Sequence, residues 1–143
     1  MEAILFSADP NKVDVEAAKR HLAHHKELYW AVLFPIARVG PLDGFIHMCG
    51  GRVEYRITIS QILPFSPNDQ VDERFKPEAW IQKWKENPKN LQARPWKNQL
   101  VMTDITCFSC DTLSFKKTDG TNVRMPPQGY VRVLSPSCAP AKR

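Results

Sequence analysis

The sequence predicts an α+β protein, a small mixed β-barrel with peripheral helices. Several short runs are wholly apolar or alternate apolar with polar residues, while two stretches have helical spacing. The 12 prolines against 6 glycines indicate many chain turns and few long helices. A length of 143 residues fits one domain with a hydrophobic core of its own. Strands joined by turns and interrupted by two helices favour a barrel.

The predicted strands are short and mostly separated by turn residues. They cover residues 3–8, 28–34, 45–51, 52–62, 99–108 and 130–134. The run 52–62 is the clearest, because apolar residues occupy every second position from Val53 to Ile59, as on a sheet with one dry and one wet face. The glycine pair Gly50-Gly51 directly before it predicts a hairpin turn.

Two helices interrupt the predicted strands. The first covers residues 9–27, where Asp9 is a good N-cap and Pro10 suits the first helical position. The second is short, over about residues 77–86, and lies inside a proline-rich excursion over 63–99 that breaks the strand pattern.

We expect one domain over residues 1–134, followed by a flexible tail or linker remnant over 135–143 that has no core-forming residues. The N-terminus lacks the basic region of a signal peptide, and no apolar run approaches the ~20 residues that span a bilayer. These features predict a cytoplasmic protein with no membrane partner. The net charge of +5 permits a polyanionic partner without requiring one.

Metal binding is not the preferred interpretation of the cysteines and histidines. The cysteines are Cys49, Cys107, Cys110 and Cys138, and without a signal peptide we expect thiols rather than disulfides. Cys107 and Cys110 have zinc-knuckle spacing, but a structural zinc needs four ligands, and the second pair would have to come from His47 and Cys49. His21 and His25, four residues apart, suit a metal but stand in a basic, solvated stretch. We expect neither a metal nor a cofactor.

Basic and aromatic residues are concentrated in the excursion. Residues 74–97 contain seven lysines and arginines against two acids, and they include three of the four tryptophans. Such interleaving suits nucleic acid, because cations neutralise phosphates and rings stack on bases. The candidate phosphate-binding residues are Lys83, Lys85, Lys89, Arg94 and Lys97. In the alternative interpretation Trp80 and Trp84, one helical turn apart, fasten a helix to the core.

The order of the motifs resembles that of a known family. Ser7 and Pro10 flank the start of the first predicted helix, Trp30-Ala31-Val32 follows it, and "LPF" at 63–65 precedes "RPW" at 94–96. In this order they resemble the "SEP" and "W-G-V" of the EVE domain and the "LPF" and "NPW" of its YTH relatives, all in the PUA-like superfamily. The resemblance covers about residues 3–134, although the first strand lacks the usual Tyr-Trp pair.

The resemblance implies a PUA-like, non-catalytic reader that recognises a modified, methylated base in an aromatic pocket. Its implied partner is DNA or RNA that carries the modified base, as for the specificity module of a modification-dependent restriction system with a separate motor or nuclease component. Trp30 would form one wall of the pocket, and Trp80, Trp84 and Trp96 compete for the second. Ser7 would read the edge of the base, which must leave its stack to enter.

Two other functions stay open. An ASCH-like enzyme that processes RNA or a nucleoside would use His47, Asp104 and a lysine, although the sequence contains no Gly-rich phosphate loop and no zinc-protease helix. A plain interaction module would bury all four tryptophans in its core.

Overall fold

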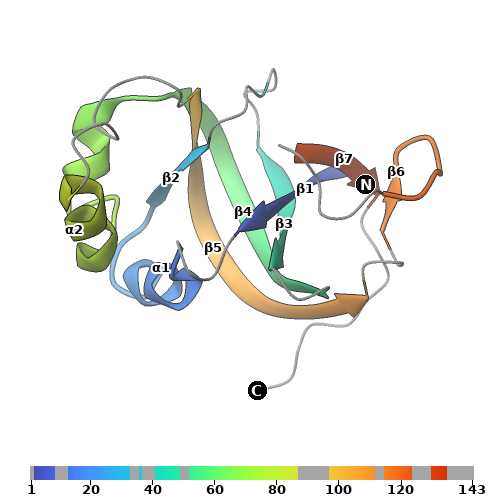
Figure 1. The fold of residues 1–143 in the computed structure, drawn as a ribbon, viewed down its shortest axis with the longest axis horizontal. Coiled ribbons are helices and arrows are strands. Elements are labelled where there is room, and N and C mark those ends of the chain that lie inside the picture. The colour runs from blue at the N-terminus through green and yellow to red at the C-terminus, as the bar shows by residue number, and fades with distance from the viewer. Residues whose placement is uncertain are drawn as a thin grey trace. The chain divides into compact units, whose positions relative to one another are not determined.

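The computed structural model describes residues 2–8, 13–32, 36, 41–48, 52–86, 97–111, 115–123 and 130–134. In chain order its elements are β1 (Glu2–Ala8), α1 (Val15–Leu22), β2 (Leu28–Val32), β3 (Leu42–Met48), β4 (Arg52–Pro64), the 3₁₀ helix η1 (Pro67–Val71), α2 (Glu78–Glu86), β5 (Asn98–Asp111), β6 (Lys116–Lys117) and β7 (Tyr130–Leu134). The prediction of a small α+β protein is confirmed (Figure 1).

The strands form a mixed sheet with the hydrogen-bonded order β2-β5-β4-β3-β1-β7-β6. Strand β1 runs parallel to β3 and antiparallel to β7. Within the described ranges the order has two ends, β2 and β6, so the strands do not close into the predicted barrel. Strand β6 has only two residues, too few to carry a ladder across to another edge.

The chain divides into two compact units. Unit 1 consists of Met1–Val13, Leu42–Thr58 and Ile105–Arg143, and unit 2 of Asp14–Pro41 and Ile59–Asp104. The predicted tail over 135–143 lies outside the described residues.

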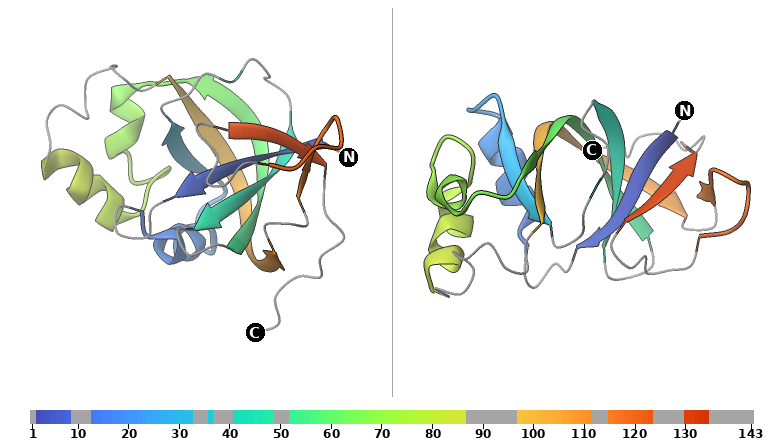
Figure 2. Two further views of the ribbon diagram at one scale, coloured as in Figure 1. Left: turned by 45° about the vertical axis from the view of Figure 1, so that its right-hand side comes forward. Right: turned by 90° about the horizontal axis from the view of Figure 1, so that it is seen from above.

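Unit 1 is built around β1, which lies between β3 and β7 (Figure 2). Its core consists of buried residues from several strands, namely Ala3, Leu5, Phe45, Val53, Phe108, Cys110, Phe115 and Val133. Gly44 on β3 leaves room for Ile57, because a Cβ at this position would lie 2.8 Å from Ile57 Cγ1. The absence of a side chain at Gly44 is therefore part of the packing in unit 1.

The alternation predicted for residues 52–62 is confirmed in β4. Val53, Tyr55, Ile57 and Ile59 are buried, while the residues between them are exposed. Burial of every second side chain is what gives this strand its dry and wet faces.

In unit 2, the helices α1 and α2 and the 3₁₀ helix η1 lie on or beside the antiparallel strand pair β2–β5. In this pair Trp30 lies opposite Leu100. Helix α1 and η1 contact β2, and α2 contacts η1. The buried amides of Gln70 and Gln99 connect η1 to β5, because Gln70 Nε2 donates to Gln99 Oε1 at 2.8 Å. Gln99 Nε2 in turn donates to Asp69 Oδ2 at 2.8 Å.

The predicted start of the first helix is wrong for the described residues. Helix α1 begins at Val15, because the Asp14 carboxylate accepts a hydrogen bond from Ala17 N–H at 3.0 Å and caps the first turn. Asp9 and Pro10, on which the earlier start rested, lie outside the described residues, as does the predicted Gly50-Gly51 turn. The second helix agrees with its prediction to within one residue.

Cys110 is disulfide-bonded, so the prediction of thiols is wrong at this position. The bond removes Cys110 from a zinc knuckle with Cys107, since only a thiolate ligates zinc. In the part of the chain that the structure describes, no three His, Cys, Asp or Glu side chains are grouped to hold a metal ion. No helix among the described residues is both long and apolar enough to span a bilayer.

Candidate functional site

Trp30 is a buried residue of β2 that packs against a second tryptophan. Its side chain is only 6% exposed. The Trp80 ring of α2 meets it edge-on, with the ring centroids 5.2 Å apart and the planes at 89°. Trp80 is fixed further by its Nε1–H, which donates to the Asp14 carbonyl at 3.1 Å. Edge-to-face contact is a preferred geometry for aromatic pairs, so Trp30 holds the Trp80 ring at a defined angle.

The unexpected residue of this aromatic cluster is Lys76. Its Nζ lies 5.5 Å from the ring centroids of both Trp80 and Trp84, over the ring of each. The residue is 4% exposed, and within the described ranges its ammonium has neither an ion pair nor a hydrogen bond. Trp80 and Trp84 lie one turn apart on α2, and Lys76 lies two residues before the helix begins.

Burial decides the charge state of this lysine. Desolvation lowers the pKa of Lys76 to about 7, and the carboxylate of Asp69 opposes the shift. Two indole faces are an attractive environment for a cation, but two cation–π contacts contribute only ~1–4 kcal/mol. The amine is therefore partly neutral at pH 7, unlike a solvent-exposed lysine.

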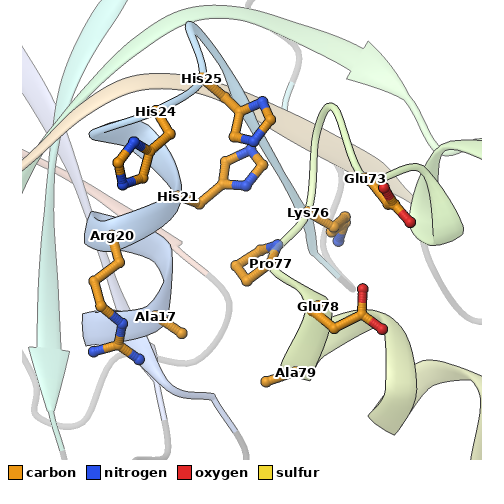
Figure 3. A pocket seen from close by; sticks show the side chains of 10 residues that line it. All are labelled: Ala17, Arg20, His21, His24, His25, Glu73, Lys76, Pro77, Glu78 and Ala79. Atoms are coloured by element: carbon orange, nitrogen blue, oxygen red, sulfur yellow. The ribbon is translucent and has the colours of Figure 1, made fainter.

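A cavity of about 430 Å³ adjoins Lys76 within unit 2 (Figure 3). One wall comes from α1 and the turn that follows it, and the other from the segment that leads into α2. The lining residues are Ala17, Arg20, His21, His24, His25, Glu73, Lys76, Pro77, Glu78 and Ala79. This volume falls in the lower part of the range of small-ligand sites, ~300–1,000 Å³. Trp30 is not among the described residues that line it.

His21 supports one wall of the cavity. Its Nε2 lies 3.0 Å from the Glu27 carbonyl and 3.1 Å from the Arg74 carbonyl, so a protonated Nε2 donates to both. Burial lowers the pKa of His21, against the effect of these two carbonyls. The ring of His25 stacks on that of His21 with centroids 4.2 Å apart. His21 is therefore neutral, and the two hydrogen bonds of its Nε2 join α1 to the segment at Arg74. This role of His21 is structural.

The predicted phosphate-binding residues divide into described and undescribed ones. Lys83 and Lys85 are exposed on α2, and Lys97 is exposed just before β5. Lys89, Arg94 and Trp96 lie outside the described residues. Three of the predicted base-binding residues, Trp30, Trp80 and Trp84, therefore lie in the same unit. Helix α2, which carries Trp80 and Trp84, also carries the exposed Lys83 and Lys85.

Ser7 belongs to unit 1, where it contacts His47. The two residues are paired across the parallel strands β1 and β3, and Ser7 Oγ lies 3.4 Å from His47 Nδ1. His47 is 5% exposed, and its Nε2 has no hydrogen-bond partner among the described residues. Burial lowers the pKa of His47, against the charge of Glu54. Asp104, the other candidate of the enzymatic alternative, is an exposed residue of β5 in unit 2.

Comparisons of the chain with protein-family models, with curated proteins and with solved structures found no match.

Proposed function

We propose that this protein is a non-catalytic nucleic-acid reader that binds a methylated base on the tryptophans of unit 2. The proposal includes the finer features expected from the motifs, a PUA-like fold related to EVE domains and a partner of DNA or RNA that carries the modified base. Trp96, Lys89 and Arg94 keep their predicted roles in base and phosphate binding as part of it, and the role of Ser7, a residue of unit 1, stays a prediction.

The observation that carries the proposal is that two indole rings face the same buried group beside a cavity. Lys76 lies over the faces of Trp80 and Trp84 and is also one of the residues that line the cavity, whereas the two tryptophans are not. A base that replaces it gains ~1–3 kcal/mol for stacking on each ring. A methyl group on that base adds ~0.8 kcal/mol of apolar burial, which is the source of discrimination.

The other residues of the cluster have supporting roles on this proposal. Trp30 is buried and sets the orientation of Trp80, so it contributes to the pocket wall through that ring. Lys83 and Lys85 are exposed on the same helix as Trp80 and Trp84, and each is adjacent in sequence to Trp84. They are thus placed to contact the phosphates on either side of a base that stacks on this ring. Phosphate contacts fix the register of the strand and leave recognition to the rings.

Binding to matched oligonucleotides tests the proposal. The panel consists of single-stranded and double-stranded DNA and of single-stranded RNA, each with N6-methyladenine, 5-methylcytosine or the plain base at one position. We expect one methylated oligonucleotide to bind about 4-fold more tightly than its plain counterpart, the equivalent of one methyl group. Equal affinities within every pair would contradict base reading.

Two variants separate base recognition from phosphate binding. Trp84→Leu removes one ring and is expected to abolish the preference for the methylated oligonucleotide. Lys85→Gln is the matched control, because it lies one residue away and is exposed. We expect it to weaken binding to both oligonucleotides equally and to reduce the salt slope on single strands by about 0.7.

A second candidate function is favoured by the Ser7–His47 contact in unit 1. A buried imidazole with an unpartnered Nε2 has unused capacity to accept or donate a proton, as an RNA- or nucleoside-processing enzyme of the ASCH-like kind requires. The test is incubation of RNA and of nucleosides with the wild type and with His47→Gln. Turnover that the substitution abolishes would support this function, and intact substrates with the wild type would contradict it.

A further inference from the structure

Lys76 is chemically unlike the other lysines described on or near α2. It is 4% exposed, whereas Lys83 and Lys85 are exposed. Lysines are seldom buried without a carboxylate partner, because the desolvation of an unpaired ammonium costs several kcal/mol. Its Nζ lies over the rings of Trp80 and Trp84, 5.5 Å from each centroid, and aromatic faces attract a cation.

Lys76, one of the residues that line the cavity, therefore carries an amine with a substantial neutral fraction. A pKa of about 7 leaves about half of the Lys76 amine neutral at pH 7, against about 1 in 2,500 for an unperturbed lysine. A neutral amine has a free electron pair, and the cavity of about 430 Å³ gives a small molecule access to the side chain. Desolvated lysines of this kind are the ones that form Schiff bases.

We propose that Lys76 is the reactive amine of a covalent site for small aldehydes, which enter the cavity between α1 and the start of α2. In the reaction the Nζ electron pair attacks the carbonyl carbon and gives a carbinolamine. The C–O bond then breaks, the two amine protons leave with the oxygen as water, and a C=N bond remains. No electrons are gained or lost overall, and hydrolysis reverses the step.

The side chains of the cavity suit this reaction. Dehydration of the carbinolamine needs an acid near the leaving oxygen, and His24, His25, Glu73 and Glu78 line the same cavity. An aldehyde suits the site better than a ketone, because its carbonyl carbon is less hindered and more electrophilic toward an amine. The ligand class is therefore a small aldehyde, recognised through its carbonyl carbon.

Reductive trapping on the native wild-type protein tests the inference. The protein is incubated at pH 7 with propionaldehyde and cyanoborohydride, which reduces the imine to a stable secondary amine, and the tagged lysines are located by peptide mass spectrometry. We expect Lys76 to be tagged about tenfold faster than Lys83 and Lys85, since its larger neutral fraction outweighs its restricted access. In concentrated urea the preference should disappear, because it depends on burial.

Tagging of Lys76 at the same rate as Lys83 and Lys85 in the native protein, or at a lower rate, would overturn the inference. Lys76→Met identifies the signal, because it should remove the fast tag and leave the tags at Lys83 and Lys85 unchanged. The experiment uses no nucleic acid, so its result is independent of whether the protein reads a modified base.

Discussion

Replacement of Lys76 by methionine tests the description of the buried amine through the pH dependence of stability. Methionine keeps the length and apolar stem of the side chain and makes favourable contacts with aromatic rings, but it cannot be protonated. Lys76 has a folded-state pKa of about 7 and an unfolded-state value near 10.5. Between these two values the unfolded chain binds a proton that the folded protein does not.

The sign and size of the effect follow from this difference. Because the unfolded state holds more protons above pH 7, the free energy of unfolding rises with pH in the wild type. The slope approaches ~1.4 kcal/mol per pH unit, and integration from pH 7 to pH 9 gives a gain of about 2 kcal/mol from Lys76 alone. Below pH 7 both states are protonated, and the protein carries the full cost of the buried cation.

The measurement is urea unfolding followed by circular dichroism at pH 7, 8 and 9. Subtracting the values for Lys76→Met cancels the other titrating groups, so the difference in unfolding free energy should move by about 2 kcal/mol in favour of the wild type. Lys85→Met, at an exposed position of α2, is the matched control and should follow the wild type at every pH. A wild-type minus Lys76→Met difference that stays constant from pH 7 to pH 9 would refute a strongly lowered Lys76 pKa.

Three further substitutions test the packing of the two units by the same unfolding measurement. Trp80→Ala should cost about 2–4 kcal/mol, because it removes an edge-to-face contact, an indole hydrogen bond and a cation–π contact; a cost under 1 kcal/mol would show that the ring is not anchored. Gln99→Leu should cost about 1–3 kcal/mol, because the buried Gln70 Nε2 keeps only its bond to the Ser66 carbonyl and Asp69 loses its donor; a neutral effect would contradict the pairing of the two amides. Gly44→Ala should cost about 1–3 kcal/mol, since the new Cβ would lie 2.8 Å from Cγ1 of the buried Ile57; unchanged stability would mean that this core side chain shifts freely.

The strands of this protein could be predicted from local pattern where one face is dry and the other wet. In β4 the side chains from Val53 to Ile59 alternate in burial as they alternate in polarity, so the period of two was sufficient. The start of α1 was not predictable from capping residues alone, because Asp9 and Asp14 are both suitable N-caps. Among the described residues, the side chain of Asp14 accepts a hydrogen bond from an N–H of the first helical turn, that of Ala17.

The candidate site was predicted in part. Three tryptophans of the predicted pocket lie in unit 2, and the four-residue spacing of Trp80 and Trp84 correctly indicated one helical stripe. The same spacing includes Lys76, but a lysine in a basic stretch is expected to be solvated, so its burial was missed. The cavity was beyond local pattern, because its two walls come from segments about fifty residues apart, around His21 and around Lys76.

The most direct test of the account is a titration of the wild-type protein with a methylated oligonucleotide and its plain counterpart while tryptophan fluorescence is recorded. Base stacking on Trp80 and Trp84 predicts quenching that saturates at a lower concentration of the methylated strand, and Trp84→Leu should make the two curves coincide. Identical curves for the wild type, or a methylated strand that binds without any change in fluorescence, would contradict recognition of a modified base by these rings.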